Sequence, residues 1–391
     1  MSKIDELIAQ YCPNGVEYKR LEDIFKISRG RVMSKEYLSQ NKGKYPVYSS
    51  QTANNGQIGK ISTYDYDGEY LTWTTDGANA GTIFYRNEKF SITNVCGLLK
   101  ANSFEILPKF AYYVLSITMK SFVSSGMGNP KLMSNIVAKI QIPIPPIPVQ
   151  EEIVNILDKF TELEAELEAE LEARRKQYEY YRNRLLSTTE VNGKWLMNGV
   201  EVEWKTLGEV GKICMCKRIM KHETKSDGDI PFYKIGTFGK EADAYISTEL
   251  YNDYKRRFNF PKVGEVLISA SGTIGRTVIY DGKPAYFQDS NIVWISNDES
   301  AVTNKFLFHY YKIVEWKTDG GTISRLYNDN LAKTKIPIPP LAEQERIVGI
   351  LDKFDKLVND ISEGLPAEIE ARRKQYEYYR GKLLNFKKVN E

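Results

Sequence analysis

The sequence contains few of the residues from which metal sites and disulfide frameworks are built. Among its 391 residues there are only 2 histidines and 4 cysteines, and no two cysteines form a CxxC pair. Structural zinc needs several closely spaced Cys or His ligands, so we predict no metal site. We expect the cysteines to be free thiols of a cytoplasmic protein, since disulfides persist only in oxidising compartments.

Long apolar runs and signatures of catalysis are also lacking. No stretch approaches the roughly 20 apolar residues of a membrane-spanning helix, and the polar opening MSKIDELIAQYCPNG has no apolar signal core. There is no GxxxxGK[ST] phosphate loop, no GxGxxG turn, no HExxH pair and no [ND]PP[YF] tetrapeptide of amino-methyltransferases. The segment SGTIGRT (Ser271–Thr277) lacks the lysine and the spacing of a phosphate loop, and we interpret it as a turn. We therefore predict no catalytic residue and no cofactor in this chain.

What the sequence does contain is enough hydrophobic residues for packed cores and an uneven distribution of charge. Hydrophobic residues make up 42% of the chain, and its length suits two domains with connectors. The net charge is only +3, but the strongly acidic segment 162–172 leaves the rest of the chain more basic. The 26 tyrosines suit wet recognition surfaces, because the ring packs while the hydroxyl forms hydrogen bonds.

One run of residues occurs twice. EARRKQYEYYR spans Glu172–Arg182 and again Glu370–Arg380. Each copy follows a second shared block, which reads IPIPPIPVQEEIVNILDKF from Ile142 and IPIPPLAEQERIVGILDKF from Ile336. The chain therefore consists of two long repeats that each end in the same helix.

The segments before the shared helices repeat one plan as well. NGVEYKRLEDI matches NGVEVEWKTLGEV with a two-residue insertion, and SSGMGNPKL matches TDGGTISRL, which aligns Gly126 with Gly320. Short β-type runs such as KYPVYSS, EYLTWTT and TIFYR are separated by glycine turns, and FAYYVLSITMKSFV has helical spacing. We predict an α+β fold of two duplicated mixed α/β domains, 1–147 and 190–341, and two long helices, 148–189 and 342–391.

Apolar and aromatic residues recur at seven-residue intervals along both long helices. Two interleaved series of this kind predict a coiled-coil seam. The second helix has four extra residues between its blocks, and Gly364 and Pro366 fall there, so we predict a kink or short break. Packing of each helix on its own domain is the alternative, but the recurrence of the seam favours an antiparallel coiled coil with pseudo-two-fold symmetry. The predicted seam or partner-docking residues are Leu157, Phe160, Leu167, Leu171, Arg174, Tyr178, Tyr181, Leu351, Phe354, Ile361, Arg372, Tyr376 and Tyr379.

The duplicated PIPP[IL]xxQExIVxILDKF block followed by EARRKQYEYYR resembles the specificity subunits of type I restriction–modification enzymes. The resemblance covers the whole chain, and YPVYSSQTANNGQIG, LTWTTDGANAGT, SASGTIGRT and YFQDSNI are also similar to that family. It implies two target-recognition domains, each of which binds one half of a bipartite, asymmetric DNA site. It also implies a non-catalytic subunit on whose helices two methyltransferase subunits dock, bringing S-adenosylmethionine for adenine methylation. Motor–nuclease subunits would join them and consume ATP with Mg²⁺.

The length of the helices gives a scale for such a DNA site. The seam from Leu157 to Leu186 spans about 30 residues, or roughly 45 Å at 1.5 Å per residue. One turn of DNA is about 34–36 Å, so we expect the two half-sites to lie about one turn apart.

Candidate DNA-contacting residues are chosen by side-chain type, because the resemblance does not identify them. Amides, guanidinium groups and small hydroxyls read base edges, whereas lysines and backbone amides hold phosphates. In the first domain the candidates are Arg29, Arg31, Lys35, Tyr48, Ser50, Gln51, Asn54, Asn55, Thr74 and Lys131. In the second domain they are Lys217, Arg218, Lys221, Lys234, Arg256, Arg257, Ser271, Arg276 and Arg325. For each of them, an ordinary solvated side chain or turn residue is the competing interpretation.

Other residues are given different roles. Trp73 and Trp294 are expected in hydrophobic cores rather than stacked on bases. The duplicated, basic Arg174, Arg175, Arg372 and Arg373 are alternative candidates for DNA contacts. They lie on the shared helices, away from the divergent segments, which favours a role in the seam or in binding a partner. The rival function is a structural adapter with two protein-binding domains on a coiled coil, which would have no affinity for duplex DNA.

Overall fold

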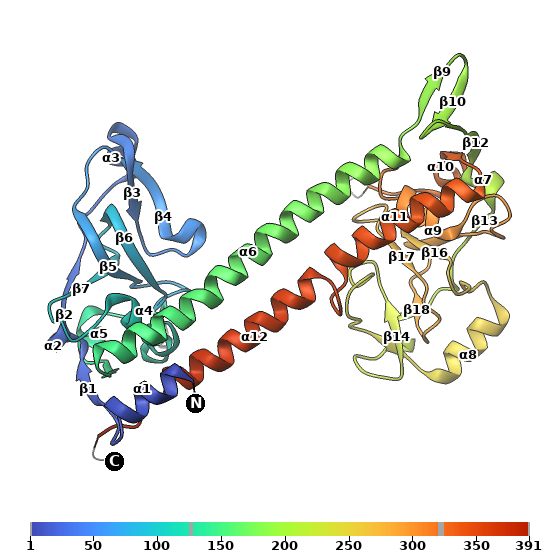
Figure 1. Cartoon of the computed structure of the whole chain (residues 1–391). Coiled ribbons are helices and arrows are strands. Elements are labelled where there is room, and N and C mark those ends of the chain that lie inside the picture. Colours follow the sequence, from blue (N-terminus) through green and yellow to red (C-terminus); the bar gives the residue numbers. More distant parts are fainter. Residues whose placement is uncertain (1, 125–127, 320–323, 390–391) are drawn as a thin grey trace. The chain divides into compact units, whose positions relative to one another are not determined.

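The chain folds into two compact units, and each contains one globular domain and parts of the long helices (Figure 1). Unit 1 comprises Met1–Glu168 and Ile369–Glu391, and unit 2 comprises Ala169–Glu368. The predicted loop glycines Gly126 and Gly320 lie outside the described residues. The computed structural model describes residues 2–124, 128–319 and 324–389.

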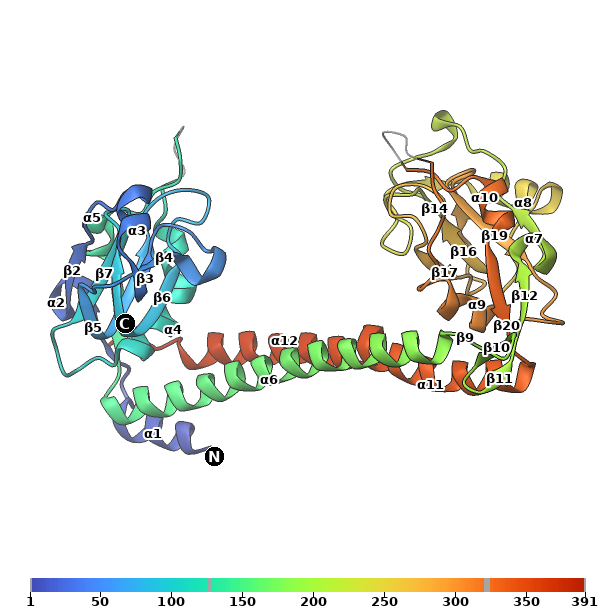
Figure 2. The ribbon, with the colours of Figure 1, turned by 90° about the horizontal axis from the view of Figure 1, so that it is seen from above.

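Unit 1 is organised around one large mixed sheet. Its elements are α1 (Lys3–Tyr11), β1 (Glu17–Arg20), α2 (Leu21–Ile24), β2 (Phe25–Arg29), α3 (Lys35–Gln40), β3 (Lys42–Tyr48), η1 (Ala53–Gly56), β4 (Gln57–Ile61), β5 (Tyr66–Thr74), β6 (Ile83–Ile92), β7 (Cys96–Ala101), α4 (Pro108–Thr118), η2 (Met119–Phe122), α5 (Ser134–Val137), β8 (Gln141–Ile144) and α6 (Ile147–Leu186), which continues into unit 2. The six-stranded sheet has the order β2-β7-β5-β6-β3-β4, and β3 and β6 are its only parallel neighbours in the part that the structure describes. Helix α1 lies beside the first turns of α6 (Figure 2), where Lys3 Nζ pairs with Glu152 Oε2 at 2.5 Å.

The core of unit 1 lies between the sheet and α4. Trp73 on β5 is fully buried in the same cluster as Phe110 of α4, and its indole N–H donates to the carbonyl of Leu132 at 3.1 Å. Gly97 faces Trp73 across the β5–β7 pair, and a Cβ there would lie 2.2 Å from the indole ring. A glycine is therefore required at position 97. The predicted core position of Trp73 is confirmed.

Unit 2 repeats this plan with smaller sheets. Its elements are β9 (Thr189–Val191), β10 (Lys194–Met197), β11 (Val200–Glu201), β12 (Glu203–Thr206), α7 (Leu207–Val210), β13 (Lys212–Cys214), η3 (Lys221–Glu223), β14 (Ile230–Tyr233), β15 (Tyr245–Ile246), α8 (Thr248–Arg257), β16 (Val266–Ser269), β17 (Thr277–Ile279), β18 (Tyr286–Phe287), β19 (Ile292–Ser296), α9 (Asn304–Tyr310), α10 (Asn328–Lys333), β20 (Lys335–Ile338) and α11 (Leu341–Asn359). A four-stranded sheet, β13-β19-β16-β17, stands beside a three-stranded one, β15-β14-β18. Trp294 on β19 is 1% exposed, so its predicted core position is also confirmed.

A short strand pair shows the common frame of the two units. In unit 1, β1 pairs antiparallel with β8, and Tyr18 faces Pro143. In unit 2, β12 pairs antiparallel with β20, and Trp204 faces Pro337. The two pairs have the same register, which confirms the alignment of Tyr18 with Trp204 across a two-residue insertion.

The two long helices differ in continuity. Helix α6 is unbroken over 40 residues. The second is divided, because α11 ends at Asn359 and α12 (Leu365–Leu383) begins after Gly364. The predicted break at Gly364 and Pro366 is therefore confirmed, as is the α+β class with duplicated mixed domains and long helices. In the described part of the chain, no helix is long and apolar enough to cross a membrane.

Candidate nucleic-acid interface

The two domains hold the loop at the end of a central strand in the same way. In unit 1 the loop after β5 is held by Leu132, whose N–H donates to Thr75 O at 2.8 Å. In unit 2 the loop after β16 is held by Leu326, whose N–H donates to Ala270 O at 2.9 Å. Divergent side chains are therefore presented on a backbone frame that both domains share.

A basic residue precedes each of these leucines and lies in the same place. Lys131 forms a β-bridge with Asp76, and Arg325 forms one with Ser271. These are the candidates that follow the glycine loops in the sequence, and the structure brings each of them next to the loop after the central strand. Lys131 is exposed and Arg325 is half-buried.

Several candidates of the first domain are engaged inside the protein. Tyr48 is 5% exposed, and its hydroxyl donates to Glu88 at 2.6 Å while the Arg86 guanidinium lies 3.5 Å from its ring. Burial and the bond to Glu88 raise the pKa of Tyr48 to about 12. The Ser50 hydroxyl accepts from two N–H groups of the loop after β5, and Thr74 is buried with its hydroxyl bonded to the same loop. These side chains support the loops of the candidate surface.

The remaining candidates of the first domain lie nearer to solvent. Arg31 is exposed, and its Nε donates to Asp65 Oδ2 at 3.0 Å. Asn54 and Asn55 are exposed with left-handed φ angles of 50° and 54°, and Lys35 is exposed at the start of α3. Asparagine tolerates that backbone region better than most residues, so these two positions favour a turn that projects amides.

Two further candidates of the first domain are partly tied to neighbouring segments. Arg29 is half-buried, and its Nε donates to Ser134 Oγ at 3.2 Å. Gln51 donates from Nε2 to the carbonyl of Gln57 at 2.8 Å. The first bond joins the end of β2 to α5, and the second holds the loop between β3 and β4.

In the second domain, four candidates line one depression of about 460 Å³. Arg218, Lys221, Lys234 and Arg325 come from segments far apart in the sequence, so folding brings them together. Ser271 is buried beside it, and its hydroxyl donates to Asn291 Oδ1 at 2.9 Å. The result is a concave, basic surface with polar side chains among its lining residues.

Other candidates of the second domain do not line this depression. Lys217 is exposed, with its ammonium 5.3 Å from the ring of Phe258. Arg256 and Arg257 lie at the end of α8 and pair with Asp253 at 3.3 and 2.7 Å. Arg276 is half-buried, and its guanidinium donates to the carbonyl of Phe238 at 2.8 Å.

Reasoning from the sequence missed the polar turn between β18 and β19. Gln288, Asp289 and Asn291 all line the depression. They stand in YFQDSNI, a segment identified only as similar to a family. The positive φ of Ser290, 58°, marks the same turn as a constrained backbone.

The seam of the long helices is built in the same way in both units, by antiparallel pairing. In unit 1, Phe160 of α6 stacks on Tyr379 of α12 with ring centroids 5.6 Å apart, and α6 and α12 lie side by side (Figures 1 and 2). In unit 2, Phe354 of α11 stacks on Tyr181 of α6 at 5.5 Å. The LDKF end of each repeat therefore packs against EARRKQYEYYR of the other repeat.

Other predicted seam residues follow this pairing to different degrees. Leu157, Leu351 and Leu167 are buried, and Tyr376 lies 6.2 Å from the ring of Phe160. Residues that are half-buried along the same faces are Leu171, Arg174 and Arg372. Ile361 is 85% exposed, because it falls in the break between α11 and α12 and so packs in no seam.

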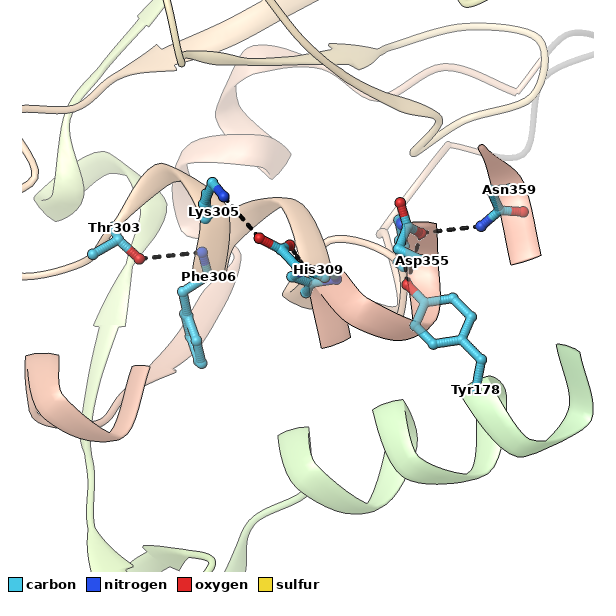
Figure 3. Close-up of polar contacts among 9 residues, drawn as sticks. Tyr178, Thr303, Lys305, Phe306, His309, Asp355 and Asn359 are labelled. Carbon is cyan, nitrogen blue, oxygen red and sulfur yellow. Dashed lines mark hydrogen bonds and ion pairs between the residues drawn. The ribbon is translucent and has the colours of Figure 1, made fainter. Parts of the chain in front are cut away.

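The polar contacts beside the seam differ between the two units. In unit 1, Arg373 reaches across to Glu164 and Glu168 at 2.5 Å each. In unit 2, Tyr178 instead donates to Asp355 Oδ1 at 3.1 Å (Figure 3). Its hydroxyl also accepts from Lys312 Nζ at 3.1 Å. Asp355 also pairs with Lys312 at 2.8 Å. A charged cluster thus ties α6 and α11 to α9 and its following turn.

Burial and pairing set the proton affinities of this cluster. Burial raises the pKa of Tyr178 and lowers that of Lys312. Burial alone would raise the pKa of Asp355, but hydrogen bonds from Lys312 and Asn359 lower it overall. Asp355 is therefore the anion and Lys312 the cation of the pair near neutral pH.

A neighbouring aspartate anchors α9. Asp352 pairs with Lys305 at 2.7 Å, and its other oxygen lies 2.7 Å from His309 Nε2 (Figure 3 shows both basic side chains). His309 Nδ1 is buried with no hydrogen-bond partner among the described residues. Burial lowers the pKa of His309 and outweighs the opposing effect of Asp352, which fits a neutral ring with its proton on Nε2. In unit 1 the corresponding aspartate, Asp158, accepts hydrogen bonds from Lys109 and Tyr113.

A pair of glutamines, also missed in the sequence, fixes the start of each long helix. Gln150 is fully buried and bonds the carbonyls of Pro145 and Glu105 and the N–H of Leu107. Gln344 does the same in unit 2 with Pro339, Ala301 and Thr303. The signal that could have identified these residues is the glutamine that occurs in both copies of the shared proline block.

The exposed face of EARRKQYEYYR is also duplicated. Tyr180 is 58% exposed and Tyr378 is 66% exposed. Lys176 and Lys374 flank them, each bonded to a glutamate four residues earlier. In each unit, therefore, one face of the run packs in the seam and the other presents the same tyrosine and lysine to solvent.

Comparisons with known proteins agree with this architecture. The family model described as "Type I restriction modification DNA specificity domain" matches residues 13–173 and 199–371. A Haemophilus influenzae protein named as a type I restriction enzyme specificity subunit is 48% identical over 95% of this chain and 96% of its own length. A Mycoplasma pneumoniae protein named as a type I specificity subunit is 35% identical over 94% of this chain and 97% of its own length. The crystal structure of a type I restriction–modification S subunit from M. genitalium has a TM-score of 0.61 at 16% identity, covering 95% of this chain and 96% of that one.

Proposed function

The chain belongs to the family of type I restriction–modification specificity subunits, and on that premise we propose that it is the sequence-reading subunit of such a complex. Each globular domain binds one half of a bipartite, asymmetric site in duplex DNA. The subunit itself carries out no chemistry. The functional division follows the four segments 1–147, 148–189, 190–341 and 342–391.

The observation that carries this proposal is the depression of the second domain. Arg218, Lys221, Lys234 and Arg325 give it positive charge, while Gln288 and Asn291 line it with amides. Guanidinium groups and amides are the side chains that recognise base edges in a groove, and lysines neutralise phosphates. A protein-binding adapter would have no need of such a surface.

The test is to map adenine methylation in cells that carry this chain together with its methyltransferase subunit. Single-molecule sequencing should reveal one bipartite motif with an adenine in each half. Methylation without a bipartite motif, or no affinity of the assembled complex for duplex DNA, would remove the proposal and favour the adapter.

The helices serve as docking platforms for two methyltransferase subunits, which bring S-adenosylmethionine. The duplicated exposure of Tyr180 and Tyr378 supports two equivalent sites, since a partner present in two copies needs the same surface twice. Exposed tyrosines often anchor protein interfaces. Motor–nuclease subunits then bind this assembly and use ATP and Mg²⁺, and the complex acts on DNA in the cytoplasm.

Docking can be tested with Tyr180→Ala and Tyr378→Ala. Each should weaken methyltransferase binding at one site by roughly 10- to 30-fold, as expected for loss of an interface anchor. Tyr64→Ala, at a tyrosine that is 41% exposed on the first domain, is the matched control. Unchanged stoichiometry of the double variant in analytical ultracentrifugation would contradict the docking role.

The helices also set the distance between the half-sites. Lengthening α6 by four residues, or deleting the four extra residues around Gly364, should change the preferred spacer in the methylation motif. A four-residue segment of helix is about 6 Å long, close to two base-pair steps at ~3.4 Å. An unchanged spacer in both variants would show that the helices are not the ruler.

A further inference from the structure

The amide groups that line the depression in the second domain can be assigned as donors or acceptors. Gln288 Oε1 accepts from the backbone N–H of Ile235 at 2.9 Å. Asn291 Oδ1 accepts from Arg325 Nη2 at 3.0 Å, and a guanidinium can only donate. The carbonyl oxygens of both amides are therefore occupied, and their NH₂ groups remain as donors.

Arg218 is held by a carboxylate that itself lines the depression, whereas Lys234 pairs with Asp243, which does not line it. The Nε of Arg218 donates to Asp289 Oδ2 at 2.9 Å, while its side chain is 66% exposed. Asp289 is only 15% exposed and also accepts from the hydroxyl of Ser290, so its position is fixed. No other hydrogen bond of Arg218 is found in the part of the chain that the structure describes. Both terminal nitrogens of the guanidinium are thus free and their direction is fixed by Asp289.

The surface consequently offers donors and almost no free acceptors. Lys221, Lys234, Arg325 and the two amides add donors around Arg218, and Asp289 is the only carboxylate among the described lining residues. In the major groove, adenine and cytosine present an amino donor, thymine presents one acceptor beside a methyl group, and guanine presents two adjacent acceptors, N7 and O6. Two parallel N–H donors of an arginine match the two acceptors of guanine.

We infer that Arg218, positioned by Asp289, reads a guanine in the half-site bound by the second domain. The inference rests on the proposed function and deepens it, because it names one base pair of the site and the residue that selects it. Asn291 and Gln288 contribute further donors at the same surface. Arg218 is a specificity-determining residue, and Asp289 is a positioning residue that acts through it.

The inference is tested by mapping methylation motifs for the whole complex with substituted chains. In Arg218→Ala, one G·C pair of the motif should become degenerate, with a roughly 10- to 100-fold loss of preference for guanine, the range of one good bidentate contact. Arg218→Lys should also lose preference there, because an ammonium keeps the charge but not the planar fork. Asp289→Asn should relax the same position and no other, because it frees the guanidinium to turn.

Lys283→Ala is the matched control, since it removes a positive charge from the same domain at a side chain that is 84% exposed and pairs with Asp281 at 3.3 Å. It should leave the motif unchanged. Thermal unfolding of each variant checks that the domain is intact, which is expected because Arg218 is largely exposed.

Each other outcome is decisive. An unchanged motif in Arg218→Ala and Arg218→Lys overturns the inference, and so does relaxation at an A·T pair. A uniform loss of methylation at all sites, without altered base preference, would identify Arg218 as a phosphate contact. In all three cases the wild-type chain still gives a bipartite motif, so the proposed function survives. Absence of any bipartite motif for the wild-type chain would remove the proposed function instead.

Discussion

Two tyrosines in identical sequence surroundings should respond differently to loss of their hydroxyl groups. Tyr178 and Tyr376 occupy the same place in the two copies of EARRKQYEYYR. Both rings pack against the phenylalanine of the other repeat. Tyr178 also bonds to the half-buried ion pair of Asp355 and Lys312, so Tyr178→Phe and Tyr376→Phe form a matched pair that tests this polar contact.

The magnitude follows from the contacts of the hydroxyl. The Tyr178 hydroxyl lies 3.1 Å from both Asp355 Oδ1 and Lys312 Nζ. Hydrogen bonds to charged groups contribute about 1.5–3 kcal/mol. Asp355 keeps Lys312 at 2.8 Å and Asn359 at 3.0 Å, so the lower end applies, and we expect a loss of about 1.5 kcal/mol. Tyr376→Phe should cost within about 0.5 kcal/mol, as is usual where no buried contact is removed.

Urea unfolding followed by tryptophan fluorescence can separate the two effects. Of the 5 tryptophans only Trp73 lies in unit 1, so the signal reports mainly on unit 2. The fluorescence midpoint should fall in Tyr178→Phe, while that of Tyr376→Phe should match the wild type. Equal midpoints for the two variants would refute the view that the polar cluster of unit 2 contributes to stability.

Three further variants test other parts of the structure. Burial lowers the pKa of His309, so its imidazole stays neutral in the folded state, whereas the histidine of the unfolded chain takes up a proton below about pH 6.5. Unit 2 should therefore lose stability as the pH falls through that value. His309→Tyr, which installs the residue found at Tyr113 in the other repeat, should remove this pH dependence in thermal melts at pH 5 and pH 7.5. Gln344→Met should lower the free energy of unfolding by about 3 kcal/mol or more, because it leaves two carbonyls and one N–H buried without partners. A loss under about 1 kcal/mol would show that water replaces the amide. Gly97→Ala should destabilise unit 1 by about 1–3 kcal/mol or more, because its Cβ would overlap Trp73, and near-UV circular dichroism of that indole should change with it.

The repeated frame was predictable from sequence because identical segments under identical constraints fold alike. The shared blocks predict the long helices, and Gly364 with Pro366 predicts the break between α11 and α12. The divergent segments were harder. Helices α3 and α8 were not predicted, although Ser34 and Ser247 cap them, since both are short and polar.

The candidate surface was predictable only in part, for a reason of distance along the chain. Basic residues such as Arg218 stand out in a sequence, and the structure groups it with Arg325. Asp289, which orients Arg218, is 71 residues away, and nothing in the local pattern pairs the two. Side-chain type thus indicates what can bind, whereas orientation and buttressing depend on contacts between distant strands.

The reciprocal seam has a consequence for the order in which the protein forms during synthesis. Unit 1 begins first on the ribosome, but its part Ile369–Glu391 is made after all of unit 2. The ring contact of Phe160 with Tyr379 can therefore form only after unit 2 has been synthesised. The same holds for the backbone hydrogen bonds of Val16 with Lys387 and Val389. Unit 2 is contiguous and can close while the chain is still growing. The domain that is translated first should thus be the last to complete its fold. Until then the apolar surface that Ile369–Glu391 covers stays exposed, and chaperones should bind the chain mainly at this stage.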